Sequence, residues 1–282
     1  DIYYALQTTG LLDKLLAGGF RYAFVSNADN LGALLHLGIL GHIASHNVPF
    51  LMEVTARTEC DRKGGHLGRD AATGRLLLRE SAQCPPDETE DFQDITKFSL
   101  FNTNNLWLDL AALREMLRAA DGLPQLPLIV NRKTVDPVRS DSPAVVQLEA
   151  AMGSAISCFD NAAALVVPRF RFAPVKTTND LLAIRSDLYT LGEEHQVALH
   201  PQRFSPPPAI TLDARYYRNI ADFEQRFAKG APSLIACDSL DITGDIYFGA
   251  NVRIEGAVHL RNPTDTPARI ADGTRLHTPI RP

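Results

Sequence analysis

The sequence has few cysteines, no excess of basic residues and no long hydrophobic run. Its 282 residues include four cysteines, which are far apart and form no C-x-x-C pair: Cys60, Cys84, Cys158 and Cys237. This spacing argues against a disulfide framework or a zinc site and favours a reducing cytoplasm. Lys and Arg number 28 against 33 Asp and Glu, for a net charge of −5. Nucleic acid is therefore not expected as the main partner.

The sequence also predicts neither a membrane span nor a signal peptide. No uninterrupted apolar stretch approaches the ~20 residues that cross a bilayer. The chain opens on Asp1 in what reads as mid-sequence, so we expect a fragment or a processed chain. The hydrophobic share of 45% and charged share of 22% are those of a globular protein with a full-sized core. The length suits one large domain, or a large one with a small one.

Short apolar runs alternate with helical patterns over the first 190 or so residues, which predicts a layered α/β domain. The expected strands are Tyr22–Ser26, Phe50–Thr55, Arg75–Arg79, Pro127–Val130 and Leu165–Val167. Apolar residues at three- and four-residue spacing predict helices over 107–119, after Ser142-Pro143 and after Thr178. A short helix is expected near 220–227, and residues 31–40 would form another if Asp29 or Asn30 is a helix cap. The proline-rich segment 200–208 is expected to be a surface connection.

A six-residue period begins near Ser233. Leu240, Ile246, Val252 and Val258 share one phase, and Ile270 and Leu276 return to it. Such a period predicts a short β-helix of two or three coils, in which each inward aliphatic stacks on one a turn away. Because six-fold spacing also contains period two, an antiparallel sheet is the alternative.

Asp29 lies in a polar turn directly after the first expected strand. Ligands of open α/β sheets bind beyond the carboxyl ends of strands, and a carboxylate there suits Mg²⁺, which fills its shell with phosphate oxygens. The alternative is that Asp29 or Asn30 only caps a helix. A second candidate is Lys63-Gly-Gly65, where paired glycines allow close approach to a ligand, although Lys-Gly-Gly is also a common turn.

Two more motifs have polar residues near an expected helix start. Phe101-Asn-Thr-Asn-Asn-Leu-Trp107 has amides that could both donate to and accept from sugar hydroxyls, or could simply cap a helix. Lys176 precedes Thr-Thr-Asn-Asp, where it could contact a phosphate or be an exposed lysine ahead of a cap. His42 and His46 fit a solvated helix face, and no nucleophilic arrangement stands out.

The order of these motifs is more specific than any one of them. In sequence and spacing the chain resembles the eukaryotic-type UDP-glucose pyrophosphorylases over essentially its whole length. The segments that carry the resemblance are Ser26-Asn-Ala-Asp-Asn-Leu-Gly-Ala33, Met52-Glu-Val-Thr55, Lys63-Gly-Gly65, Phe101-Asn-Thr-Asn-Asn-Leu-Trp107, Val175-Lys-Thr-Thr-Asn-Asp-Leu181 and Thr243-Gly-Asp-Ile-Tyr-Phe-Gly249.

The resemblance implies a fold and a reaction. The fold is an α/β nucleotidyltransferase domain, Rossmann-like with a mixed central sheet, over residues 1–199. A connecting segment with a short helix would follow over 200–232, and a short left-handed β-helix over 233–282. The reaction joins UTP and glucose 1-phosphate into UDP-glucose and pyrophosphate by Mg²⁺-dependent in-line attack on the α-phosphate. The implied protein is cytoplasmic, and its C-terminal domain could mediate homo-oligomerisation.

The resemblance also assigns roles to residues of this chain. Asp29 would bind the Mg²⁺, and Asn27 and Ala28 belong to the same substrate-contacting turn. Asn104 would hydrogen-bond the glucose. Gly65 and Glu80 would be further sugar contacts. The catalytic residue would be Lys176, in contact with the UTP phosphates, and we expect it to lie close to Asp29.

One departure from the family pattern concerns the nucleotide. The family's glycine-rich loop and following lysine, which grip UTP, are absent from these residues, as are the Gln that reads uracil and a Gly-His pair. One alternative is therefore a non-catalytic sugar-phosphate-binding or oligomerisation fragment. A hexapeptide-repeat acyltransferase is the other alternative, which is disfavoured because such enzymes need many more coils.

Overall fold

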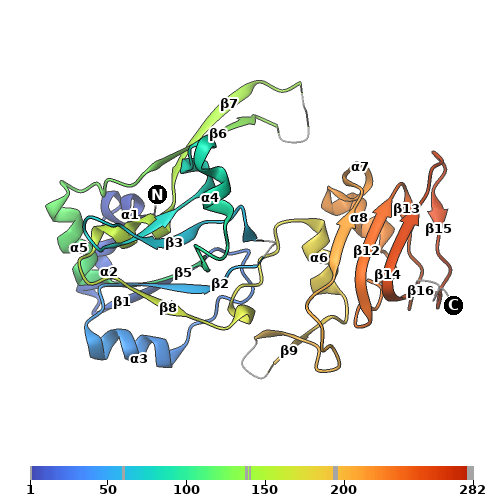
Figure 1. The fold of residues 1–282 in the computed structure, drawn as a ribbon, viewed down its shortest axis with the longest axis horizontal. Coiled ribbons are helices and arrows are strands. Elements are labelled where there is room, and N and C mark those ends of the chain that lie inside the picture. The colour runs from blue at the N-terminus through green and yellow to red at the C-terminus, as the bar shows by residue number, and fades with distance from the viewer. Residues whose placement is uncertain (1, 59–60, 137–138, 140, 193–195, 278–282) are drawn as a thin grey trace. The chain divides into compact units, whose positions relative to one another are not determined.

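The computed structural model describes residues 2–58, 61–136, 139, 141–192 and 196–277. The chain divides into two compact units (Figure 1). Unit 1 comprises residues 1–27 and 33–172, and unit 2 comprises residues 28–32 and 173–282. The domain boundaries expected at residues 199 and 232 stay predictions.

Unit 1 contains a six-stranded mixed sheet in the order β4-β3-β5-β2-β8, with β1 paired to β5. Only the β2–β8 pair is parallel; the other pairs are antiparallel. The strands are β1 Tyr22–Val25, β2 Phe50–Ala56, β3 His66–Arg69, β4 Leu76–Arg79, β5 Leu100–Asp109 and β8 Ala163–Val166. The mixed central sheet and four of the expected strands are thereby confirmed.

Helices cover both faces of this sheet, and the alternation of side chains along β2 shows why. Phe50, Met52 and Val54 join a core with residues of α1 Ile2–Thr8, α2 Leu11–Ala17, α5 Leu110–Ala119 and the 3₁₀ helix η4 Met152–Cys158. Leu51 packs on the other face with residues of α3 Leu37–His46. Because β2 is buried on both faces, its sequence is almost continuously apolar. The exceptions are Thr55 and the acidic Glu53.

The helix expected over 107–119 begins later than predicted. Trp107 belongs to strand β5, and α5 begins at Leu110. Asp109 caps this helix because its carboxylate accepts hydrogen bonds from the backbone of Ala111 and Ala112, at 2.9 and 3.1 Å. The asparagine motif that ends at Trp107 therefore lies within a strand and not in a helix cap.

Two other expected helices were wrong in their first parts, although η4 Met152–Cys158 lies within the one expected after Ser142-Pro143 and α3 overlaps segment 31–40. The residues after Ser142-Pro143 form strand β7 Ala144–Ala150, which pairs over seven residues with β6 Leu128–Thr134, the strand expected near 127–130. Consecutive β-branched valines in this segment favour a strand. Segment 31–36 is not helical either, because Leu31 donates a 3.1 Å backbone hydrogen bond to Ala173; helix α3 begins only after His36.

The later part of unit 2 begins with α6 Thr178–Arg185 and the two-stranded sheet β9 Tyr189–Leu191 and β10 Val197–Leu199. Segment 200–208 connects these to β11 Ala209–Leu212 without regular secondary structure, as predicted. Helices α7 Ala214–Tyr217 and α8 Ile220–Arg226 follow. The remaining strands are β12 Cys237–Thr243, β13 Ile246–Tyr247, β14 Arg253–Arg261, β15 Ala268–Arg269 and β16 Arg275–His277.

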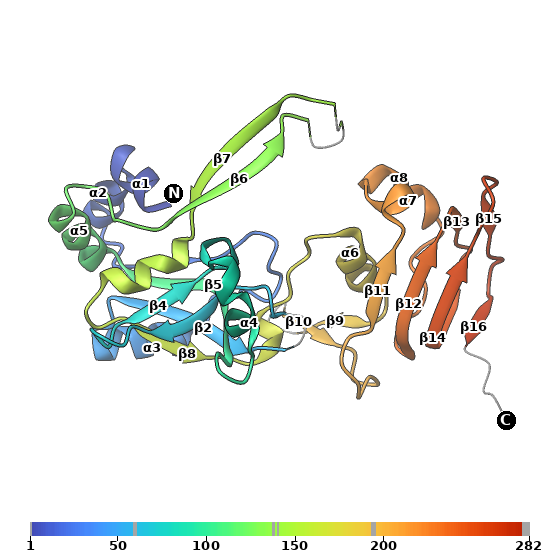
Figure 2. The ribbon, with the colours of Figure 1, turned by 45° about the horizontal axis from the view of Figure 1, so that its top comes forward.

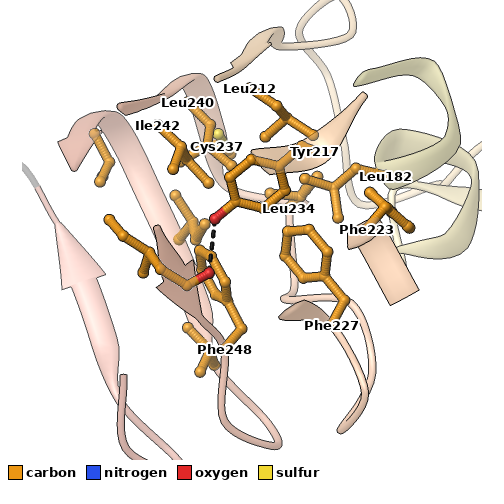
Figure 3. Close-up of a cluster of buried hydrophobic side chains, with 14 of the residues drawn as sticks. Leu182, Leu212, Tyr217, Phe223, Phe227, Leu234, Cys237, Leu240, Ile242 and Phe248 are labelled. Atoms are coloured by element: carbon orange, nitrogen blue, oxygen red, sulfur yellow. Dashed lines mark hydrogen bonds between the residues drawn. The ribbon is translucent and has the colours of Figure 1, made fainter. Parts of the chain in front are cut away.

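These strands stack in parallel, β11-β12-β14-β16 in one sheet and β13-β15 in another. Leu240 and Val258 of the six-residue phase lie directly opposite each other, whereas Ile246 lies opposite Ala268 and Leu276 opposite Ile254. The core that they form also holds Phe223, Phe227 and Tyr217, whose hydroxyl donates a 2.7 Å hydrogen bond to the Ile246 carbonyl (Figure 3). The parallel register excludes the antiparallel alternative for the described hexad strands.

None of the helices within the described residues has both the length and the apolar character needed to cross a bilayer. Cys84, Cys158 and Cys237 are free thiols. Cys60 lies outside the described residues.

Candidate functional site

Four residues of unit 1 lie together, and we call them the asparagine cluster: Gly65, Glu80, Asn102 and Asn104. The backbone N–H of Asn102 donates to the Gly65 carbonyl at 3.2 Å. The Asn102 amide donates to the Asn104 side-chain oxygen at 2.7 Å, while the Asn104 N–H donates to the Asn102 side-chain oxygen at 2.9 Å. Glu80 lies beside Gly65, because a Cβ on Gly65 would be 2.5 Å from a Glu80 carboxyl oxygen. The structure thus brings together the three residues expected to contact the sugar.

Asn104 has an unusual backbone for a strand residue. Its φ is +58°, a left-handed conformation that Asn tolerates better than most residues. The pairing of β5 with β2 shifts register between Met52 and Val54, opposite this position. Such a bulge redirects a side chain out of the regular alternation. Asn104 is only half-buried, whereas Asn102 and Asn105 are buried, so it is the asparagine of the motif that can reach a ligand.

Close neighbours leave no room for a side chain at either glycine of Lys63-Gly-Gly65. A Cβ on Gly65 would lie 2.5–2.6 Å from three atoms of the Glu80 carboxyl group, and a Cβ on Gly64 would collide with the Phe101 ring. The turn is also anchored by Asp61, which accepts hydrogen bonds from Arg169 at 2.8 and 3.0 Å. Hydrogen bonds from Arg169 and Thr58 lower the Asp61 pKa despite burial. A close-packed, charge-anchored turn of this kind fixes the position of Gly65.

Asp29 and Lys176 belong to unit 2 and lie on neighbouring segments, although 146 residues separate them in the sequence. Residues 28–32 and 173–176 form what we call the short ladder. Asn30 bridges Pro174 in antiparallel register, and the Val175 N–H donates to the Asp29 carbonyl at 2.9 Å. The Asn30 side chain accepts from the backbone of Gly32 and Ala173 at 3.1 and 2.8 Å. Asp29 is therefore paired with the residue before Lys176.

The side chains of these two residues differ in exposure. Asp29 Oδ1 is buried and has no hydrogen-bond partner. Lys176 is exposed, and its ammonium takes part in no ion pair within the described residues. An orphaned carboxylate oxygen is costly unless a ligand completes it. This arrangement fits a metal ion or another cationic partner at Asp29, together with an anion at Lys176.

The segment that carries Lys176 is held by a helix cap. Asp180 accepts from the backbone of Lys176 and Thr177 at 3.0 and 2.8 Å, and from the Thr177 hydroxyl at 2.9 Å. The cap fixes the backbone at Lys176 while its side chain stays solvated. Asn27 is half-buried and belongs to unit 1, whereas Ala28 is exposed and belongs to unit 2. Within the described residues, no group of three His, Cys, Asp or Glu side chains could hold a metal ion by itself.

Sequence reasoning assigned no role to Glu53, which is fully buried. Its carboxylate accepts hydrogen bonds from Arg171 at 2.6 and 2.7 Å, from the Trp107 indole at 2.8 Å and from the Asn105 amide at 3.1 Å. Arg171 also donates to the Leu34 carbonyl at 2.7 Å. These contacts fix β5 beside Asn104. The signal in the sequence was an acidic residue within a buried strand, which demands a partner.

His66 was also missed. Its ring is completely buried, stacks on Phe98 with centroids 4.0 Å apart and contacts Phe92. Neither ring nitrogen has a hydrogen-bond partner. Burial, and then the charges of Arg57 and Arg79, lower the His66 pKa to about 4. The imidazole is therefore neutral at physiological pH and packs as an aromatic spacer behind Gly65.

A pH dependence of stability follows from His66. The unfolded chain takes up a proton near pH 6.5, whereas the folded chain does so only near pH 4. Stability from this group is therefore present above pH 6.5 and is lost as the pH falls toward 4, by up to about 3 kcal/mol. Urea unfolding across this range should show the loss. His66→Phe should remove it, and His42→Phe, an exposed control, should retain it. An unchanged slope in His66→Phe would contradict the assignment.

A mixed sheet with helices on both faces, an amide-rich cluster in unit 1 and the short ladder in unit 2 define an α/β protein. The chain belongs to the UTP–glucose-1-phosphate uridylyltransferase family, whose sequence profile matches residues 1–255.

Individual relatives agree with this family. The chain is 43% identical over 274 residues to a UTP–glucose-1-phosphate uridylyltransferase of Solanum tuberosum, covering 97% of this chain and 55% of the relative. A solved UDP-glucose phosphorylase of Trypanosoma brucei is 47% identical, with a TM-score of 0.88 over 98% of this chain and 59% of that one. A mutant UDP-glucose pyrophosphorylase of Leishmania major, solved in complex with UDP-glucose, is 45% identical, with a TM-score of 0.86 over 98% of this chain and 60% of that one. The chain thus spans little more than half the length of these relatives.

Proposed function

We propose that these 282 residues belong to an enzyme that forms UDP-glucose and pyrophosphate from UTP and glucose 1-phosphate. The observation that carries the proposal is the short ladder, which places Asp29 opposite the residue before Lys176 in a chain of this family. The product has a sugar and a diphosphate. The asparagine cluster has the donors and acceptors that a sugar requires, and the short ladder has the charges that phosphates require.

The reaction proceeds by in-line displacement. A phosphate oxygen of glucose 1-phosphate forms a bond to the α-phosphorus of UTP, and the bond between that phosphorus and the bridging oxygen breaks, so that pyrophosphate leaves. The Lys176 ammonium neutralises charge on the transferred and leaving phosphates. Asn104, Glu80 and the backbone at Gly65 orient the glucose, and the turn at Asn27 and Ala28 makes further substrate contacts.

Asp29 would hold the Mg²⁺ cofactor. Its buried and unpartnered Oδ1 fits this role, because Mg²⁺ is commonly bound through one or two carboxylates and takes its other ligands from phosphates and water. Bound Mg²⁺ would neutralise phosphate charge.

Two further properties belong to this proposal. The parallel strands and six-residue phase of unit 2 support a short left-handed β-helix, whose open end could pair with a second subunit. The free thiols of Cys84, Cys158 and Cys237 support a cytoplasmic location.

The function is tested by assay of the full-length protein, with UTP, glucose 1-phosphate and Mg²⁺. Pyrophosphate and UDP-glucose should form in equal amounts. The alternative, a non-catalytic sugar-phosphate-binding or oligomerisation fragment, predicts that UDP-glucose binds but is never formed. Binding without turnover in the full-length protein would therefore favour the alternative.

Gly65 offers a sharper test of the sugar contacts. Gly65→Ala should displace the Glu80 carboxylate, because the new Cβ would lie within 2.6 Å of it. Misplacement by about an ångström costs on the order of 100-fold in kcat/KM, and we expect the loss mainly as a higher KM for glucose 1-phosphate. Gly68→Ala is the matched control, since its Cβ meets only the Leu77 side chain at 3.7 Å. Equal kinetics in the two variants would remove Gly65 from the sugar site.

A further inference from the structure

The β6–β7 hairpin projects from the rest of unit 1 in both views (Figures 1 and 2). Its two strands pair over seven residues, from Leu128 opposite Ala150 to Thr134 opposite Ala144. Neither strand pairs with a third within the described residues. An isolated two-stranded ribbon is at best marginally stable in water, so this hairpin needs support from other residues.

The two faces of the hairpin differ in polarity. Successive residues of a strand point to opposite faces. One face carries four large aliphatic side chains, each more than half exposed: Leu128 at 59%, Val130 at 54%, Val146 at 52% and Leu148 at 58%. We call this the apolar face. The opposite face carries four polar side chains, Asn131, Lys133, Gln147 and Glu149, together with Ile129 and Val145. Hydrogen bonds join Asn131 to Glu149 and Lys133 to Gln147 across the strands, and Gln147 to Glu149 along β7. The apolar face also carries Arg132, but the opposite face is the more polar of the two.

The apolar surface continues at the foot of the hairpin. A cavity of about 220 Å³ is lined by Tyr3 and Tyr4 of α1, by segment 123–126 and by Ala150, which shares the phase of the apolar face. Tyr4 and Leu123 are each 53% exposed. Contiguous exposed aliphatic surface of this kind is typical of a region that another part of a protein covers.

We propose that the apolar face is covered, in the full-length protein, by polypeptide outside these 282 residues. The chain is matched over 97–98% of its own length, yet it spans only 55% of the Solanum tuberosum relative and 59% of the Trypanosoma brucei structure. Roughly two-fifths of each of these relatives therefore lies outside the part that the chain matches. The covering segment packs aliphatic or aromatic side chains against the four exposed ones and shields the hydrogen bonds between β6 and β7 from water. This inference is independent of the proposed function.

Hydrogen exchange tests the proposal. The amides of residues 128–134 and 144–150 should exchange at least about tenfold more slowly in the full-length protein than in the 282-residue chain. The reason is that hydrogen bonds between strands open less often when another segment covers them. Equal exchange in the two proteins would overturn the proposal. So would slow exchange in the 282-residue chain that appears only at high protein concentration, since a second copy would then be the occupant. A gene that encodes no further residues would overturn it as well.

A matched pair of variants separates burial from local strand effects. Val146 lies on the apolar face opposite Arg132, and Val145 lies on the other face opposite Lys133. Either Val→Glu change places a carboxylate across from a cation. In the full-length protein, Val146→Glu should speed hairpin exchange by about tenfold and lower the Tm, whereas Val145→Glu should alter both far less. In the 282-residue chain the two should behave alike. Equal effects in the full-length protein would contradict a covered apolar face.

Discussion

Lys176→Ala is expected to lower kcat of the full-length enzyme by about 10²- to 10³-fold, the usual cost of removing one electrostatic contact to a transition state. The loss should fall on kcat and much less on glucose 1-phosphate binding, because the ammonium would act on the transferred and leaving phosphates. The helix cap is made by the Thr177 and Asp180 side chains and by backbone N–H groups, so its hydrogen bonds do not involve the Lys176 side chain. The variant should therefore fold normally. Steady-state kinetics with each substrate varied would measure the effect.

Lys229→Ala is the control for this experiment. Lys229 belongs to the same unit and is exposed, but its ammonium is paired with Asp272 at 2.9 Å. Its loss should leave kcat within about twofold, as for exposed ion pairs in general. A Lys176→Ala enzyme with unchanged turnover would remove Lys176 from the mechanism. A loss that is equal in both variants would point to a general charge effect and not to a specific contact.

The second large effect concerns stability. Glu53→Gln is expected to lower the free energy of unfolding by about 3–5 kcal/mol, because it leaves the buried Arg171 guanidinium without its carboxylate. The shape of the side chain is nearly preserved, so packing loss contributes little. Urea unfolding of the 282-residue chain at neutral pH would measure the change.

Two controls define this result. Arg118→Met breaks an exposed pair with Glu115 and should cost less than about 1 kcal/mol. The double variant Glu53→Leu with Arg171→Met should recover part of the lost stability, because no buried charge is then left unpaired. A Glu53→Gln chain within about 1 kcal/mol of the unmodified chain would show that Arg171 finds other partners.

Sequence patterns predicted strands better than helices in this protein. Strands such as β2 have an apolar run bounded by polar residues, and this pattern is local. The expected helix after Ser142-Pro143 failed because β7 shows apolar residues at helical as well as strand spacing. Its pairing with β6 decided the outcome. Likewise, Leu31 pairs with Ala173 across 142 residues, a contact that no local pattern can indicate.

For the candidate site, residue types were easier to predict than partners. Asp29, Asn104 and Lys176 could be selected because polar residues follow or interrupt apolar runs. The left-handed backbone of Asn104 and the crowding of Gly65 by Glu80 arise from pairing and packing, and could not be read from spacing. Glu53 was detectable in principle, since a charge in a buried strand must be paired. Its partner Arg171 lies 118 residues away.

The short ladder also limits how this protein could be divided. The chain passes from one unit to the other three times: after Asn27, after Gly32 and after Phe172. After a protease cut behind Phe172, the two fragments would still be held together without a covalent bond, because residues 28–32 of the first fragment pack with the second. Separate expression of the later half would omit Asp29 and the strand that pairs with Val175. Unit 2 could not be exchanged between proteins as one continuous segment, because residues 28–32 would have to be transferred together with residues 173–282.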